Sequence, residues 1–285
     1  MKIKFFTLLL LTVFFVSCSD DDTNDTGNNN PLTGFAKVQE FTDGDTTFEL
    51  YTATGDLVQG YNTIKLKVKS GDNYIDNADL SWEPMMHMET MTHNHMRSED
   101  MMMHSCPNSS ITNEGEGVYS GYIVFQMPTV DGGTWNLNIS ANIDGEDIVI
   151  QDKITVQAQE YTTSKQFEAG NGKVYVLALI APENLGVGVN KIQVTLHERT
   201  SMMSFPVVKN YTFALEPRMP DMMHGSPNNE DFTYDASTHN YYGKVNLTMT
   251  GRWMLHLKLS DDMDNLIEGS DIVDEKSDLY LEFAF

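Results

Sequence analysis

The chain has 285 residues with 41 acidic and 18 basic side chains, which gives a formal net charge of −23 at pH 7. Phosphate backbones repel such an acidic chain, so nucleic acid is excluded as a partner. The length suits one large domain or two ordinary ones, and a hydrophobic content of 40% is enough for a buried core.

The beginning of the chain has the pattern of a bacterial lipoprotein signal. Two lysines and an apolar run over residues 5–16 precede Ser17 and Cys18. The run is too short to span a membrane but has the length of a signal-peptide core. We therefore expect residues 1–17 to be a signal peptide and Cys18 to carry a lipid, which would be the protein's only membrane anchor.

An acidic stretch follows the expected lipidation site. Ser19 and the run Asp20 to Asp22 resemble the surface-export signal of Bacteroidetes lipoproteins, and the alternative is a plain solvated tether. We expect residues 18–34 to be a flexible acidic tether. The expected location is the outer membrane, lipid-anchored and exposed on the cell surface, with its periplasmic face as the alternative.

The remainder of the chain contains a twofold internal repeat. Five blocks recur in the same order, which indicates duplication of a whole domain. The matching blocks are 60–68 with 188–196, 82–84 with 215–217, 100–108 with 221–228, 119–127 with 241–249, and 135–139 with 253–257.

Each copy has the hydrophobic pattern of β-strands. Ile64, Leu66 and Val68 alternate with lysines, as in a strand buried on one face, whereas residues 174–179 suggest a strand buried on both faces. Residues 279–285 predict a C-terminal strand. The expected fold is all-β, with two tandem immunoglobulin-like β-sandwich domains after the signal peptide and tether. We place the first domain at 35–160 and the second at 161–285.

Methionine and histidine gather in one segment of each copy, 85–106 in the first and a shorter 219–227 in the second. Each segment connects two strands, so it should lie at one end of a sandwich and reach solvent. Thioether sulfur is soft and suits Cu(I), while imidazole adds affinity for Cu(II) and Cu(I). We therefore expect copper binding for capture, buffering or transfer to a protein partner. The predicted ligands are Met102, Met103 and His104 with Met222, Met223 and His224, which the copies share, and Met85, Met86, His87, Met88, His93, His95 and Met219.

Two other interpretations of the methionines remain open. Met85, Met88, Met91, His95 and Met102 fall near helical spacing, so a short helix could cover the open end of the sandwich. Alternatively, the segment could dock a protein partner in surface adhesion or assembly, since methionine adapts well to other surfaces. Metal ligands should converge on one point, whereas docking residues should be spread over a patch.

Several isolated residues have more ordinary expectations. Met127, Met249 and Met254 lie inside strand patterns and should fill cores. Three histidines stand alone in strand-like contexts, which predicts surface or cross-strand roles: His197, His239 and His256.

The motifs of the two copies also resemble those of a known family. Glu83-Pro84-Met85, the block 102–107, Tyr119-Ser120-Gly121 and Gly133-Thr134-Trp135 resemble the YtkA-like (FixH-related) domain, and the second copy repeats the pattern. The resemblance implies an exported immunoglobulin-like module, often linked with copper handling. We expect no enzymatic activity, because the chain lacks common catalytic motifs and Cys106 near His104 has no expected pocket.

Overall fold

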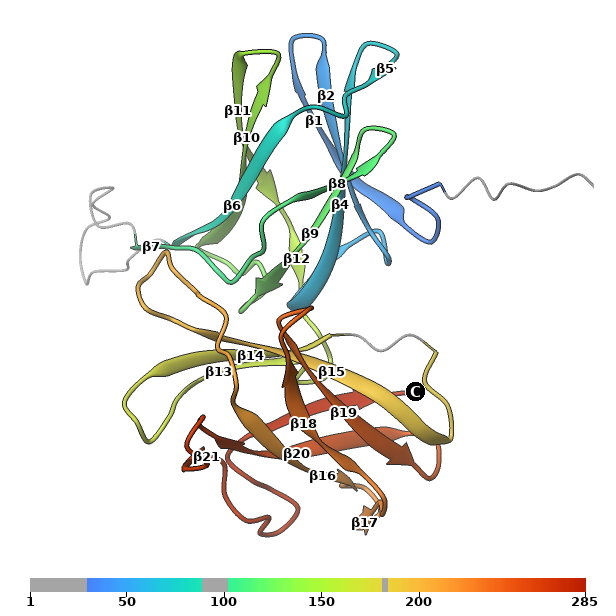
Figure 1. Cartoon of the computed structure of the whole chain (residues 1–285), viewed down its shortest axis with the longest axis vertical. Helices are drawn as coiled ribbons and strands as arrows, with labels where there is room; N and C mark the ends of the chain where they lie inside the picture. Colours follow the sequence, from blue (N-terminus) through green and yellow to red (C-terminus); the bar gives the residue numbers. More distant parts are fainter. Residues whose placement is uncertain (1–29, 89–101, 181–183) are drawn as a thin grey trace, which may run out of the picture. The chain divides into compact units, whose positions relative to one another are not determined.

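The computed structural model describes residues 30–88, 102–180 and 184–285, and within these ranges every regular element is a β-strand (Figure 1). The prediction of an all-β fold with two tandem β-sandwich domains is confirmed. Residues Pro31–Phe285 form one compact unit. No helix in the described ranges is long and apolar enough to cross a membrane.

The first sandwich has two facing sheets around one core. The first sheet contains β1 (Ala36–Asp43), β2 (Thr46–Thr52), β4 (Gly60–Ser70), β9 (Val118–Phe125) and β8 (Thr112–Gly115) in this order, with β5 (Asn73–Tyr74) beside β4. The second contains, in order, β11 (Glu146–Ile154), β10 (Gly133–Ile143), β6 (Asp79–Met88) and β7 (Met102–His104). A short parallel pair joins β3 (Leu57–Val58) to β12 (Val156–Gln157).

The second sandwich is built from one continuous sheet that surrounds its core. Its strands are β13 (Ser164–Glu168), β14 (Val174–Ile180), β15 (Gly188–Glu198), β19 (Asn240–Leu247), β18 (Glu230–Asp235), β16 (Thr212–Met219), β20 (Arg252–Ser260) and β21 (Leu266–Glu268), in this order. In addition, β17 (His224–Gly225) pairs with β16, and β22 (Tyr280–Ala284) with β20. Because β18 bonds to both β19 and β16, it joins the two halves that stay separate in the first sandwich.

Equivalent strands of the two copies pair in the same register. Ile64 lies opposite Gly121 in the pair β4/β9, and Ile192 lies opposite Gly243 in the pair β15/β19. Trp135 and Trp253 are both fully buried, as predicted. Each indole N–H donates to a main-chain carbonyl at 3.1 Å, that of Met127 in the first copy and that of Met249 in the second.

The burial of individual strands follows their sequence patterns. Strand β4 buries Ile64, Leu66 and Val68, which confirms the expected alternation. Strand β14 is buried on both faces, also as predicted. One face contributes Leu177 and its alternate neighbours to the core of the second sandwich, whereas Val176 on the other face packs in a separate cluster with Val124, Tyr61 and Tyr122 of the first sandwich.

The short-helix interpretation of the methionine segment is wrong for its described part. Residues 85–88 end β6, and residues 102–104 form β7. Strand β10 pairs with β6 as far as Met88, which draws residues 85–88 into an extended ladder despite their helical spacing.

Candidate functional site: the methionine and histidine residues

Strands β6 and β7 bring three predicted pairs of ligands together in the first sandwich. Met86 lies opposite His104, His87 opposite Met103, and Met88 opposite Met102. Directly opposite side chains share one face of a sheet and have Cβ atoms about 5 Å apart. The ladder therefore sets methionine opposite histidine at two positions and methionine opposite methionine at one.

The same ladder separates the three residues of the shared motif. Successive side chains of a strand point to opposite faces, so Met103 lies on the face opposite to Met102 and His104. Met102 and Met103 expose 55% and 50% of their surface. The extended backbone of β7 therefore does not gather Met102, Met103 and His104 around one point.

The second sandwich repeats this arrangement in a shorter form. Met219 lies opposite His224 across β16 and β17, as Met86 lies opposite His104. Met222 and Met223 lie in the turn between these strands and are 58% and 76% exposed. The imidazole Nε2 of His224 is 3.2 Å from the hydroxyl of Thr248.

Three of the predicted ligands are buried among other side chains. Met86 packs within the core of the first sandwich, and Met219 within the core of the second. Met85 is also buried. The thioethers of Met86 and Met219 fill space in the two cores, and all three side chains are buried, unlike Met102 and Met103. The packing expected for Met127, Met249 and Met254 is found, since the first two pack against the cores and Met254 is buried.

The structure describes only some of the other residues that were predicted as metal ligands or as the lipidation site. His87 is half-buried on β6. His93, His95 and Cys18 lie outside the described residues, together with the expected signal peptide and most of the tether. Among the described residues, no three His, Cys, Asp or Glu side chains are grouped so that they could hold a metal ion.

Cys106 is fully buried in the core of the first sandwich. Burial raises the pKa of its thiol well above the ordinary value, because the thiolate would lose its hydration. The thiol therefore stays protonated, which gives Cys106 the properties of a core residue and not of a nucleophile.

His197 is buried and joins the two sandwiches. Its Nδ1 lies 2.9 Å from the carbonyl of Phe205, and its Nε2 lies 3.1 Å from the Thr195 hydroxyl and 3.4 Å from the Tyr122 hydroxyl. Burial lowers the pKa of His197 to about 4, so the imidazole is neutral at physiological pH. The expected surface role is wrong for this residue, because the first sandwich covers this face of β15.

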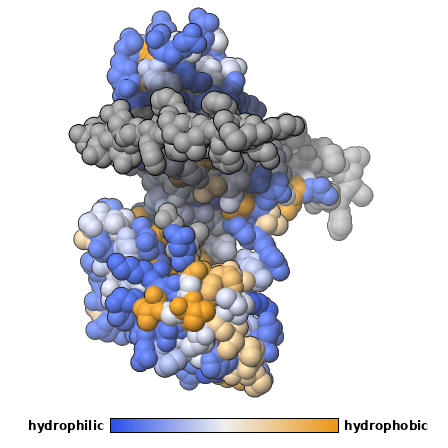
Figure 2. Space-filling model, turned by 90° about the vertical axis from the view of Figure 1, so that its right-hand side faces the viewer, coloured by the Kyte–Doolittle hydropathy of each residue, from blue (hydrophilic) through white to orange (hydrophobic). Residues whose placement is uncertain are grey.

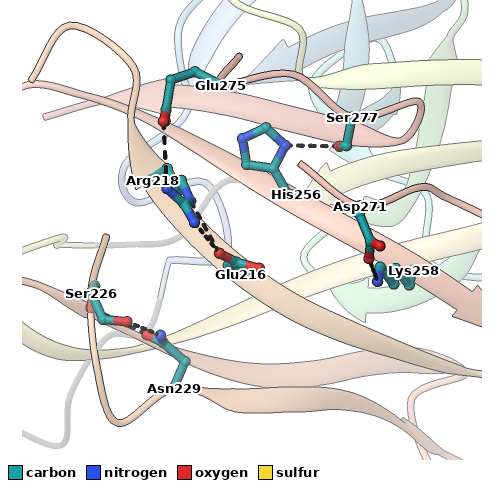
Figure 3. Close-up of polar contacts among 9 residues, drawn as sticks. All are labelled: Glu216, Arg218, Ser226, Asn229, His256, Lys258, Asp271, Glu275 and Ser277. Carbon is teal, nitrogen blue, oxygen red and sulfur yellow. Dashed lines mark hydrogen bonds and ion pairs between the residues drawn. The ribbon is translucent and has the colours of Figure 1, made fainter. Parts of the chain in front are cut away.

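His239 and His256 also have partners. His239 is exposed and its Nδ1 is 2.7 Å from the Tyr234 hydroxyl. His256 is buried and its Nδ1 is 2.8 Å from the Ser277 hydroxyl, as Figure 3 shows. Burial lowers the pKa of His256.

A network of ion pairs lies near His256 (Figure 3). Arg218 donates to Glu216 at 2.6 Å and to Glu275 at 3.4 Å, and Lys258 pairs with Asp271. Each of these carboxylates already has a cationic partner from the protein. The cluster is therefore a surface charge network and offers no open carboxylate set for a metal.

Two residues that the sequence motifs do not indicate share a cavity with His104. Met127 and Met202 line the same cavity of about 220 Å³, together with Phe205 and Arg199. Met127 follows β9, and Met202 belongs to the loop after β15, so they come from different copies of the repeat. No local spacing signals this convergence, because the three residues are far apart in the sequence.

One face of the described surface is mostly polar (Figure 2). On the face that Figure 2 shows, hydrophilic residues cover most of the described surface, and apolar residues gather in a small group. Among the described residues, seven methionines are exposed large apolar side chains: Met102, Met103, Met202, Met203, Met222, Met223 and Met263.

No protein-family model matches the chain, and no curated protein matches it. Among solved structures it is similar to a conserved domain protein from Bacillus anthracis, with 10% identity, a TM-score of 0.32, and coverage of 90% of this chain and 92% of that one. It is also similar to invasin, a bacterial integrin-binding protein, with 11% identity and a TM-score of 0.23 over 76% of this chain and 37% of that one. The Escherichia coli adhesin FdeC gives 12% identity and a TM-score of 0.23 over 83% and 81%. The YtkA-like resemblance stays a prediction.

Proposed function

We propose that this protein is a non-enzymatic binding module of the cell envelope, and that its exposed methionines dock a protein partner in adhesion or assembly. One observation carries the proposal: the methionines of the shared motif are half or more exposed and do not converge. Met102 and Met103 point to opposite faces of β7, and Met222 and Met223 lie in an open turn.

The chemistry of these side chains suits docking. Methionine is apolar, unbranched and flexible, so an exposed group of methionines adapts to an apolar surface on a partner. The net charge of −23 favours a partner with basic residues around that surface, since opposite charges speed association and fix orientation. The expected partner is therefore a protein with an apolar patch and a basic rim.

The copper hypothesis for the exposed motifs is the second candidate. The cross-strand pair His87–Met103 favours it, because it sets an imidazole opposite an exposed thioether. This pair supplies two ligands, and a third would have to come from elsewhere in the chain.

Site-specific photo-crosslinking in cells tests the docking function. A photoreactive amino acid at Met102 or Met103 should give one discrete adduct with the same partner protein. A matched control is Met263, which is 74% exposed in the turn between β20 and β21. Loss of the adduct when the neighbouring methionine is changed to Glu, as with the probe at Met102 in a Met103→Glu background, would support docking. Equal adducts from Met263, or none from β7, would contradict it.

Anchoring by a lipid at Cys18 is part of the same proposal, because docking at the cell surface requires attachment there. Cys18→Ser should release the protein from the membrane fraction or block its processing. Protease shaving of intact cells should remove the wild-type protein, and replacement of Asp20, Asp21 and Asp22 by Ala should prevent this. Unchanged membrane attachment of Cys18→Ser would refute the anchor.

A further inference from the structure

The cavity beside His104 collects three soft or borderline metal ligands from distant parts of the chain. His104 comes from β7, Met127 from the segment after β9, and Met202 from the loop after β15. We propose that these three side chains form a site for a soft monovalent cation, Cu(I) or Ag(I). This site differs from the exposed motifs and goes beyond protein docking.

Two hydrogen bonds to carbonyl groups and one ring contact hold the three residues in position. The carbonyl of Met202 accepts from the amide N–H of Ser105 at 2.8 Å, which ties the loop to the residue after His104. The carbonyl of Met127 accepts from the Trp135 indole at 3.1 Å. The His104 ring lies edge-on to Trp135 with a centroid distance of 5.8 Å. The backbone is thus in place before a cation binds, and only the flexible thioethers need to adjust.

The hydrogen bond of His104 leaves the correct nitrogen for a metal. Nδ1 lies 3.0 Å from the carbonyl oxygen of Ser105, and a carbonyl only accepts hydrogen bonds. Nδ1 of the neutral ring therefore carries the proton, and Nε2 keeps its lone pair. A carbonyl partner on one ring nitrogen is the usual way in which proteins orient a histidine for a metal on the other.

The ligand set selects a soft, singly charged ion. Two neutral thioethers and one imidazole match Cu(I) and Ag(I), whereas Ca²⁺ and Mg²⁺ require oxygen ligands and Zn²⁺ prefers histidine with thiolate or carboxylate. No Asp, Glu or Cys side chain lines this described cavity. Arg199 also lines it, and its positive charge repels a divalent cation twice as strongly as a monovalent one.

The replacement of Arg199 provides an additional test of the cation site. Its half-buried guanidinium opposes any cation in the cavity, so its removal should raise affinity. The other residues that line the cavity are neutral, including Phe205 and the amide pair in which Gln126 donates to Gln166 at 2.7 Å. Arg199→Gln should therefore strengthen binding of Ag(I), and loss of a ligand should weaken it.

The experiment is a titration of the purified full chain with Cu(I), in competition with a chromophoric chelator, and with Ag(I) by calorimetry. Met127→Leu/Met202→Leu should weaken binding at this site by about tenfold or more, because it removes two of the three ligands and keeps the volume. The matched control Met222→Leu/Met223→Leu should leave the affinity within about twofold. Arg199→Gln should raise it.

A single substitution in a loop tests the site without affecting the fold. Met202 is 38% exposed in a loop, so Met202→Leu alone should keep the wild-type thermal midpoint and still bind Ag(I) more weakly. Wild-type affinity in both Leu variants would overturn the proposal. So would a loss of binding that appears only in the Met222/Met223 control.

Discussion

Asn62 and Asn190 occupy equivalent positions in the two copies but differ in burial, so their replacement tests how burial affects stability. Asn62 accepts from the Val58 amide at 2.9 Å and donates to the carbonyls of Val58 and Gly60 at 2.7 and 2.9 Å. Asn190 makes the same three bonds, with Gly186 at 3.0 and 2.7 Å and with Gly188 at 2.8 Å. Both side chains hold the turn that leads into a strand, at glycines with φ of +97° and +116°.

The two sites differ in access to water. Asn62 is only 5% exposed, whereas the bonds that Asn190 makes with Gly186 are exposed. Asn62→Ala therefore leaves a donor and two acceptors unsatisfied in a buried site, which should lower the free energy of unfolding by about 2–4 kcal/mol. Water can replace the amide at the second site, so Asn190→Ala should cost about 1 kcal/mol.

Urea unfolding followed by tryptophan fluorescence measures both losses. Trp82 and Trp135 lie in the first sandwich and Trp253 in the second, so the fluorescence change reports on the unfolding of both. The control Asn73→Ala, at an exposed site on β5, should change stability by less than about 0.5 kcal/mol. Equal losses for Asn62→Ala and Asn190→Ala would refute the argument that burial sets the cost.

Three further predictions concern buried side chains. Trp135→Ala and Trp253→Ala should each lower the free energy of unfolding by about 3–5 kcal/mol in chemical denaturation, because each opens a large cavity in a core; a loss below 1 kcal/mol would contradict the core assignment. Burial lowers the pKa of His197 from 6.5 in the unfolded chain to about 4 in the folded protein. Protons therefore bind the unfolded chain more readily as the pH falls from 6.5 toward 4. Over this range the free energy of unfolding should fall by an amount on the order of 3 kcal/mol, all of which is present above pH 6.5. His197→Gln should flatten this part of the stability–pH curve, and an unchanged slope would refute burial as the cause. Cys106 should react with a thiol reagent only on unfolding, and rapid labelling of the native protein would show that it is accessible.

The strands could be predicted because buried residues recur at every second position of a half-buried strand. Ile64, Leu66 and Val68 alternate with lysine and lie in β4, and the continuous apolar pattern of β14 correctly indicated burial on both faces. The reason why β14 is buried on both faces could be found only in the structure, because the residues that cover its second face, Tyr61 and Tyr122, come from the other sandwich.

The candidate site was harder to predict because composition does not distinguish a core methionine from an exposed one. Met85 and Met86 are buried, whereas Met102 and Met103 in the same segment are exposed, and only the ladder with β10 explains the difference. The cavity that joins His104 to Met202 depends on contact between the two copies. Such contacts leave no periodic signal in one sequence.

Two sets of methionines have different roles: Met102, Met103, Met222 and Met223 of the shared motif dock a partner, and Met127 and Met202 hold a soft cation. Hydrogen peroxide footprinting with mass spectrometry, with and without Ag(I), measures both sets in one experiment, because a coordinated thioether resists oxidation. We predict that Ag(I) protects Met127 and Met202 and leaves Met222 and Met223 reactive. Protection of Met222 and Met223 with continued oxidation of Met202 would contradict this separation.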